Sequence, residues 1–129
     1  MTYPFEKDLG SGLILMTVKL GEKEVFKMVL DTAASLTTFD SNVLYMTNYP
    51  IGNVVEKGMI ETANGIVEVD IIEIDEISAF GRTVCGMKVQ IYDFLAHGII
   101  SDYDGLLGLD FFESTRFCID MKNQTVEID

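Results

Sequence analysis

The chain has 129 residues, with 21 Asp and Glu against 9 Lys and Arg, so its formal net charge is −12. The length suits one domain spanning residues 1–129, and 48% hydrophobic residues supply enough core material to exclude intrinsic disorder. The acidic balance excludes a phosphate-binding surface for nucleic acid, and no apolar run approaches the ~20 residues of a membrane span.

The first part of the chain predicts a β-hairpin followed by a brief helix. Residues 13–20 and 25–30 are apolar enough for two strands, and a Gly-Glu pair between them suits the turn. Residues 36–39 form a short run that favours β structure. Asp40 then suits the cap of a short helix that extends through Met46.

The middle of the chain predicts a second, longer hairpin. Residues 54–60 and 66–77 are its expected strands, and Asn64-Gly65 suits the tip because both residues accept positive φ. The apolar alternation changes phase after Ile71-Ile72, which requires a β-bulge or a change of sheet. The acidic residues that alternate with the apolar ones predict a solvated strand face rather than a cation site, because they do not converge on a point.

The last part of the chain predicts more short strands. Residues 83–92 read as a strand and 93–103 as irregular, 110–115 suit a short helix, and 117–121 with 125–128 suit a final hairpin. With about eight or nine short strands and one or two helical turns, we expect an all-β, barrel-like domain.

The sharpest motif is an aspartate that ends a strongly apolar strand. Asp31 is followed by Thr32, Ala33, Ala34 and Ser35, all small residues. A carboxylate at the end of a buried strand needs hydrogen-bond partners, and small residues let backbone N–H groups approach it. Taken alone, the motif also suits an aspartate that merely caps a turn.

Three segments in order resemble the retropepsin-like aspartic proteases of bacteria and archaea, which are single-domain relatives of retroviral protease. Leu30-Asp31-Thr32-Ala33-Ala34-Ser35 is similar to the catalytic loop, Glu61-Thr62-Ala63-Asn64-Gly65 to the tip of the flap hairpin, and Asp104-Gly105-Leu106-Leu107-Gly108-Leu109-Asp110-Phe111-Phe112 to the apolar-apolar-Gly signature with its following helix. The resemblance extends over residues 13–128.

The resemblance implies a closed acid-protease barrel with one or two short helices, in which the apolar-apolar-Gly strand lies beside the catalytic loop. Gly108 suits such a close approach, because a side chain there would have no room. The implied site has Asp31 as the catalytic residue; Thr32, Ala33, Ala34 and Ser35 as loop support; Thr62, Ala63, Asn64 and Gly65 as the substrate-binding flap; and Leu106, Leu107 and Gly108 as the structural signature. It requires no metal and no organic cofactor.

Aspartic-protease chemistry needs two carboxylates that share one proton, but the chain has one Asp-Thr/Ser-small motif. Asn42 replaces the tiny residue after Asp40-Ser41, and Asp110 suits the start of a helix. We therefore expect a C2 homodimer that pairs Asp31 with its symmetry mate and binds a peptide or protein substrate. The doubled negative charge should disfavour acidic peptides near the cleft, unless local charges differ.

Two departures from the family leave an alternative open. Ala33 stands where the family usually has glycine, and Ser35 and Leu109 replace a charged pair of the retroviral enzymes. A methyl group at Ala33 is able to crowd the two loops. The alternative is therefore a weak or inactive peptide-binding or oligomerisation module on the same fold.

The remaining candidate residues favour structural roles. Cys85 and Cys118 are too few for a disulfide framework and suit core or semi-buried thiols in a reducing compartment. The only histidine, His97, sits in a loop-like stretch with no nucleophile beside it, so we expect a loop or rim histidine. Met1 to Gly12 has charges where an export signal needs an apolar core, which predicts a cytoplasmic protein.

Overall fold

Strands dominate the computed structural model, which describes residues 1–22, 24–47, 49, 54–62, 65–99 and 101–129. In chain order the elements are β1 (Thr2–Pro4), β2 (Glu6–Lys7), β3 (Ile14–Leu20), β4 (Glu24–Leu30), β5 (Thr38–Asp40), α1 (Ser41–Met46), β6 (Val54–Thr62), β7 (Gly65–Ala79), β8 (Arg82–Tyr92), η1 (Leu95–His97), β9 (Gly105–Leu107), η2 (Leu109–Phe112), β10 (Phe117–Asp120) and β11 (Thr125–Ile128). The predicted all-β class with short helices is confirmed, and the cap of α1 is Asp40, which accepts a hydrogen bond from the Asn42 N–H.

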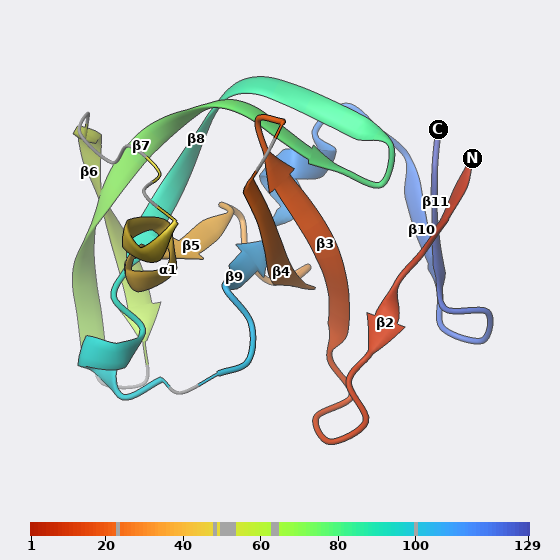
Figure 1. The fold of residues 1–129 in the computed structure, drawn as a ribbon, viewed down its shortest axis with the longest axis horizontal. Helices are drawn as coiled ribbons and strands as arrows, with labels where there is room; N and C mark the ends of the chain where they lie inside the picture. Colours follow the sequence, from red (N-terminus) through yellow and green to blue (C-terminus); the bar gives the residue numbers. More distant parts are fainter. Residues whose placement is uncertain (23, 48, 50–53, 63–64, 100) are drawn as a thin grey trace.

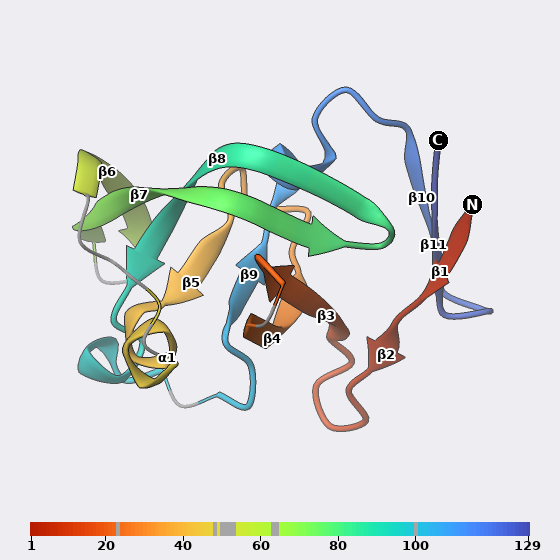
Figure 2. The ribbon, with the colours of Figure 1, turned by 45° about the horizontal axis from the view of Figure 1, so that its top comes forward.

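The larger sheet closes on itself. Its strand order is β2-β3-β4-β9-β5-β8-β7-β6, and a further antiparallel pairing joins β3 to β7. The long strands β7 and β8 arch over the ring, and β6 and α1 lie at one side of it (Figures 1 and 2). Closure through β3 and β7 gives the barrel that the sequence predicts.

The core follows from strand alternation. Along β3, Met16, Val18 and Leu20 are buried while Thr17 and Lys19 are exposed. The end of β4 is buried on both faces, since the successive residues Met28, Val29 and Leu30 are all buried. The largest fully buried side chains include Phe26, Phe39, Phe111, Leu20, Met28, Leu44, Ile74, Ile77 and Leu107.

The phase change predicted in β7 coincides with two structural features. Ile71 and Ile72 are both buried, and the register between β6 and β7 shifts between Val54 and Glu56, directly opposite them. Further along, Ile77 of β7 pairs with Leu20 of β3. The bulge therefore lies on the partner strand, and β7 exchanges one neighbour for another as it crosses the barrel.

A second, three-stranded sheet joins the two ends of the chain. Its order is β1-β11-β10, so the first strand pairs with the last, and both termini lie on the same side of the molecule (Figures 1 and 2). The sequence predicts the hairpin of β10 and β11 but not β1 or β2. Both missed strands are very short. β1 pairs with the distant β11, and β2 pairs with the neighbouring β3 over only two residues, which is too short a run to give a local pattern.

The expectation for the two cysteines is wrong, because Cys85 and Cys118 are both exposed. Each lies in a strand at a position that points outward: Cys85 pairs with Glu76, and Cys118 pairs with Glu127 at the open edge strand β10. Among the described residues, no helix has the length and apolar character needed to cross a membrane.

Candidate active site

Asp31 directly follows the end of β4, which lies beside β9. The two strands run parallel, with Val29 opposite Leu106 and Leu30 opposite Leu107. The Asp31 N–H then donates to the Leu107 carbonyl oxygen at 3.0 Å. The two segments that carry the resemblance therefore lie side by side, as the resemblance implies.

The loop after Asp31 turns tightly around its carboxylate. The Ala33 N–H donates to Asp31 Oδ1 at 2.9 Å, and the Ala34 N–H donates to the Asp31 carbonyl oxygen at 3.1 Å. Asp31 is half-buried, while Thr32, Ala33 and Ser35 are exposed. The small residues thus do what the sequence predicts, because they bring backbone donors to the carboxylate and leave the outer face of the loop open.

A buried polar cluster supports this loop from behind. The Thr37 hydroxyl donates to Asp110 Oδ1 at 2.7 Å, and the Thr37 N–H donates to Asp110 Oδ2 at 2.9 Å. The Gly108 N–H donates to the same hydroxyl at 3.0 Å. Asp110 also lies in the first turn of η2, as predicted. Its carboxylate is therefore engaged in holding two loops together, and Thr37 is a supporting residue that the sequence analysis missed.

Gly108 passes against the backbone of the Asp31 loop. A Cβ atom at this position would lie 2.7 Å from the Ala34 carbonyl oxygen and 2.9 Å from the Leu36 carbonyl carbon. The Leu109 N–H donates to the same Ala34 oxygen at 2.8 Å. The predicted lack of space for a side chain at Gly108 is confirmed.

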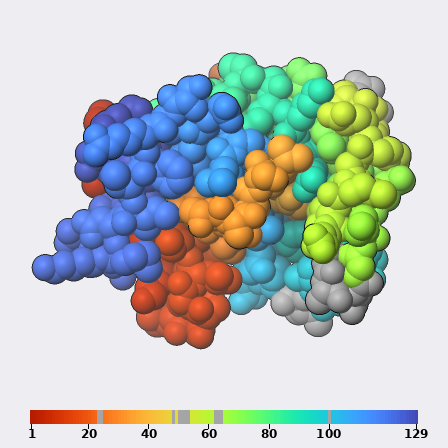
Figure 3. Space-filling model, turned by 180° about the vertical axis from the view of Figure 1, so that it is seen from behind, coloured from red at the N-terminus to blue at the C-terminus, as the bar shows by residue number. Residues whose placement is uncertain are grey.

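A large groove opens beside Asp31. Its volume is about 1010 Å³, and it lies between the Asp31 loop, β6 and the segment that follows β8. Its walls are mainly apolar and come from Leu36, Met59, Ile60, Val67, Tyr92, Phe94, Ile99, Tyr103 and Leu106. From behind, the orange loop reaches the surface beside the yellow-green strand β6 (Figure 3). The groove offers enough apolar surface to contact several apolar side chains of a ligand.

The predicted flap lies at the far end of the β6–β7 hairpin. Thr62 pairs with Gly65 across the two strands, while the predicted flap residues Ala63 and Asn64 lie outside the described residues. On β6, Met59 and Glu61 both face the groove. The hairpin therefore forms one wall of the groove that contains Asp31.

The aromatic residues and the only histidine lie at the end of β8 and in the segment between β8 and β9, and Ile60 and Val67 of the β6–β7 hairpin pack against these aromatic rings. Phe94 contacts both Tyr92 and Tyr103 edge to face, and His97 stacks on Tyr92 with ring centroids 4.3 Å apart. His97 is exposed in the 3-10 helix η1, consistent with the predicted rim position. Sequence analysis did not place it in the same groove as Asp31.

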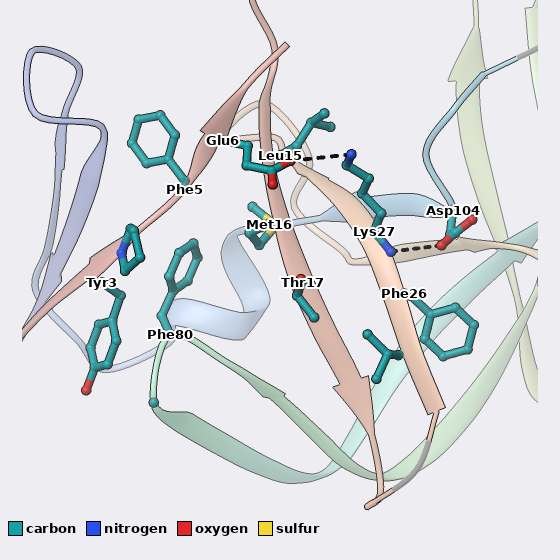
Figure 4. A pocket seen from close by; sticks show the side chains of 13 residues that line it. Tyr3, Phe5, Glu6, Leu15, Met16, Thr17, Phe26, Lys27, Phe80 and Asp104 are labelled. Atoms are coloured by element: carbon teal, nitrogen blue, oxygen red, sulfur yellow. Dashed lines mark hydrogen bonds and ion pairs between the residues drawn. The ribbon is translucent and has the colours of Figure 1, made fainter.

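A second groove of about 790 Å³ lies near the N-terminus, away from these residues. The rings of Tyr3, Phe5 and Phe80 lie on one side of it, and Lys27 lies on the other (Figure 4). Lys27 Nζ is 3.4 Å from Glu6 Oε2, and the backbone N–H of Lys27 donates to Asp104 Oδ2 at 2.8 Å. No residue of the implied site lines this groove.

Comparisons with known proteins agree with this geometry. A family model described as Aspartyl protease matches residues 16–111. The crystal structure of a retropepsin-like aspartic protease from Rickettsia conorii matches with a TM-score of 0.69, covering 98% of this chain and 88% of that chain at 16% identity. At this identity the likeness establishes the fold alone, and the predicted retropepsin-like fold is confirmed. Comparison with curated proteins gives no match.

Proposed function

Because this chain belongs to the aspartyl protease family, we propose that it is an endopeptidase that works as a homodimer, with one Asp31 from each subunit. The observation that carries the proposal is the Asp31 loop, in which a half-buried carboxylate faces a large apolar groove and the flanking Thr32, Ala33 and Ser35 are exposed. The reaction needs a second carboxylate. A twofold axis through this exposed loop supplies one, with one domain per subunit.

In the proposed reaction the two Asp31 carboxylates share one proton. The ionised carboxylate removes a proton from water, whose oxygen attacks the scissile carbonyl carbon, while the protonated carboxyl group donates to the carbonyl oxygen. The carboxyl group that took the water proton then donates it to the amide nitrogen, the other carboxylate takes back one hydroxyl proton from the intermediate, and the C–N bond breaks. The Ala33 N–H keeps Asp31 Oδ1 oriented, and each Thr32 bridges to the partner loop and holds the two carboxylates in register.

The substrate in this proposal is an extended peptide. Its backbone pairs with the groove walls, and alternate side chains occupy apolar pockets lined by residues such as Leu36, Ile60 and Phe94. The hairpins of β6 and β7, tipped by residues 62–65, close over the bound chain and exclude water.

The first experiment combines solution mass with peptide cleavage. Light scattering should give twice the 14.4 kDa chain mass. A diverse peptide library should be cleaved at roughly pH 4–7, fastest on the acidic side, and a statine-type transition-state mimic should inhibit cleavage. A folded dimer that cleaves no peptide would contradict the endopeptidase.

Ala33 distinguishes the endopeptidase from the inactive module on the same fold. Ala33 has an ordinary negative φ and an exposed side chain, so the loop accommodates its methyl group without backbone strain. We expect Ala33→Gly to change kcat/KM by about twofold or less, because the N–H that orients Asp31 Oδ1 is a backbone group that glycine keeps. Steady-state kinetics on one cleaved peptide provide the measurement. A gain of about tenfold or more would instead favour a chain that Ala33 has inactivated.

A further inference from the structure

His97 shares its groove with Asp31 and contributes a basic group to it. The groove is lined by two carboxylates, Asp31 and Glu61, and among the described residues that line it there is no Lys or Arg. His97 is therefore the one lining side chain that can become a cation. The remaining lining residues are uncharged: they are apolar or phenolic, apart from Ser35, Thr38 and Gln90.

The imidazole of His97 is held in a fixed orientation. Its ring is nearly parallel to Tyr92, with an angle of 21° between the planes. Nδ1 lies 2.8 Å from the Asp93 carbonyl oxygen, so Nδ1 must carry a proton and donate it, because a carbonyl can only accept. Nε2 has no hydrogen-bond partner in the part of the chain that the structure describes. A second proton on this ring therefore resides on the nitrogen that is free to meet a ligand.

The loop that carries His97 is anchored to α1. Asp93 Oδ1 accepts from the Ala96 N–H at 2.9 Å and from Asn42 Nδ2 at 2.7 Å. These bonds, first that from Ala96 and then that from Asn42, lower the pKa of Asp93, and the nearby His97 contributes a smaller part. The Asp93 carboxylate therefore accepts from two N–H donors and is not bonded to His97 Nε2. A substrate carboxylate can reach Nε2 without displacing the Asp93 carboxylate.

We propose that His97 determines specificity by binding a carboxylate side chain of the peptide substrate through Nε2 when its imidazole is protonated. The inference rests on the proposed function, because it takes the groove to be the substrate site. The net negative charge of the protein should repel acidic peptides in general, but a protonated His97 would attract a carboxylate at this one place. In a C2 dimer each subunit supplies one His97, so the preference should appear at two positions placed symmetrically about the scissile bond.

The chemistry confines this preference to a narrow pH range. Histidine changes charge between about pH 5 and 8, and a glutamate side chain is ionised above about pH 4.3. A protonated imidazole and an ionised glutamate are therefore present together only under mildly acidic conditions. The ring of His97 packs against Tyr92 of β8 and lies near Asp93 on its own loop, and the carboxylates of Glu61 and Asp31 line the same groove. Loss of the second ring proton would leave Nε2 an acceptor only, so the preference for a carboxylate should be lost as the pH rises.

The test uses uncleavable statine-containing peptides in matched pairs, with Glu or Gln at each position in turn. Fluorescence anisotropy measures their Kd on the intact dimer at about pH 5.5 and 7.5. We expect the Glu peptide of one symmetric pair of positions to bind about threefold more tightly at the lower pH only. His97→Asn, which keeps a donor for the Asp93 carbonyl, should remove the difference, and His97→Arg should preserve it at both pH values.

The outcomes separate this inference from the proposed function. Tight binding without a preference for Glu, or a preference unchanged in His97→Asn, would overturn the role of His97 alone. Equal weakening of Glu and Gln peptides in His97→Asn would also overturn it, since that is the effect of a merely structural residue. A His97-dependent preference with no hydrolysis of the corresponding amide peptides would overturn the endopeptidase and leave the inference standing. Absence of any peptide binding would overturn both.

Discussion

Asp31→Asn should lower kcat/KM for peptide cleavage by about a thousandfold or more, without unfolding the protein. An asparagine cannot exchange the proton that the paired carboxylates pass between water, carbonyl oxygen and amide nitrogen. It still offers Oδ1 to the Ala33 N–H, which is 2.9 Å from Oδ1 of Asp31. Steady-state kinetics give the loss, and circular dichroism with light scattering shows whether fold and mass are kept.

Two other aspartates serve as controls for this substitution. Asp102→Asn changes an exposed carboxylate that does not line the groove, so activity should stay within about twofold of the parent. Asp110→Asn weakens the cluster with Thr37, and it should lower the free energy of unfolding by about 1 kcal/mol. If Asp110→Asn abolished cleavage in a stable dimer while Asp31→Asn did not, the assignment of the catalytic carboxylate would be wrong.

Mixing of subunits tests whether the site is shared. When equal amounts of parent and Asp31→Asn chains carry different tags and are co-expressed, random pairing leaves about a quarter of the dimers with two aspartates. Activity per chain should therefore fall to about a quarter of the parent value. A fall to about half would show that each subunit acts alone. Isolation of the doubly tagged dimer, which should be inactive, makes the same comparison directly.

Local signals in the sequence predict those elements whose stabilising contacts are close along the chain. Asp40 caps α1 two residues before its hydrogen-bond partner, and the Asp31 turn is closed by Ala33 and Ala34. The alternation along β3 likewise needs only its own side chains. Each of these features follows from a side chain and the backbone next to it, so the pattern and the structure agree.

The supporting residues of the site have a different origin. Thr37 meets Asp110 across 73 positions of sequence, and Asn42 meets Asp93 across 51. A threonine after an apolar residue or an asparagine in a first helical turn has many ordinary local roles, so its own position does not reveal a distant partner. The placement of His97 on the groove wall depends on that second contact. The sequence therefore predicts the Asp31 turn but not the segment with His97 that lines the same groove.

Gly108→Ala should destabilise the barrel by about 2 kcal/mol and slow catalysis at the same time. The backbone of Gly108 has φ −94° and ψ −177°, which alanine adopts freely, so backbone strain contributes nothing. The cost comes from the added methyl group, which would lie 2.7 Å from the Ala34 carbonyl oxygen. That oxygen also accepts the Leu109 N–H, so it cannot retreat without breaking a hydrogen bond. Any shift of Ala34 moves the turn that orients Asp31.

Gly10→Ala is the matched control, because a Cβ at Gly10 meets only the Asp8 carboxylate oxygen, at 3.7 Å. Its stability should stay within about 0.5 kcal/mol of the parent. Urea unfolding of both variants at one chain concentration gives the comparison, since the stability of a dimer depends on concentration. An unchanged urea slope with a lower midpoint in Gly108→Ala is expected. Equal midpoints for the two variants would mean that β9 can move away from the Asp31 loop at no cost in stability. Close packing at Gly108 would then not explain the alignment of the Asp31 carboxylate.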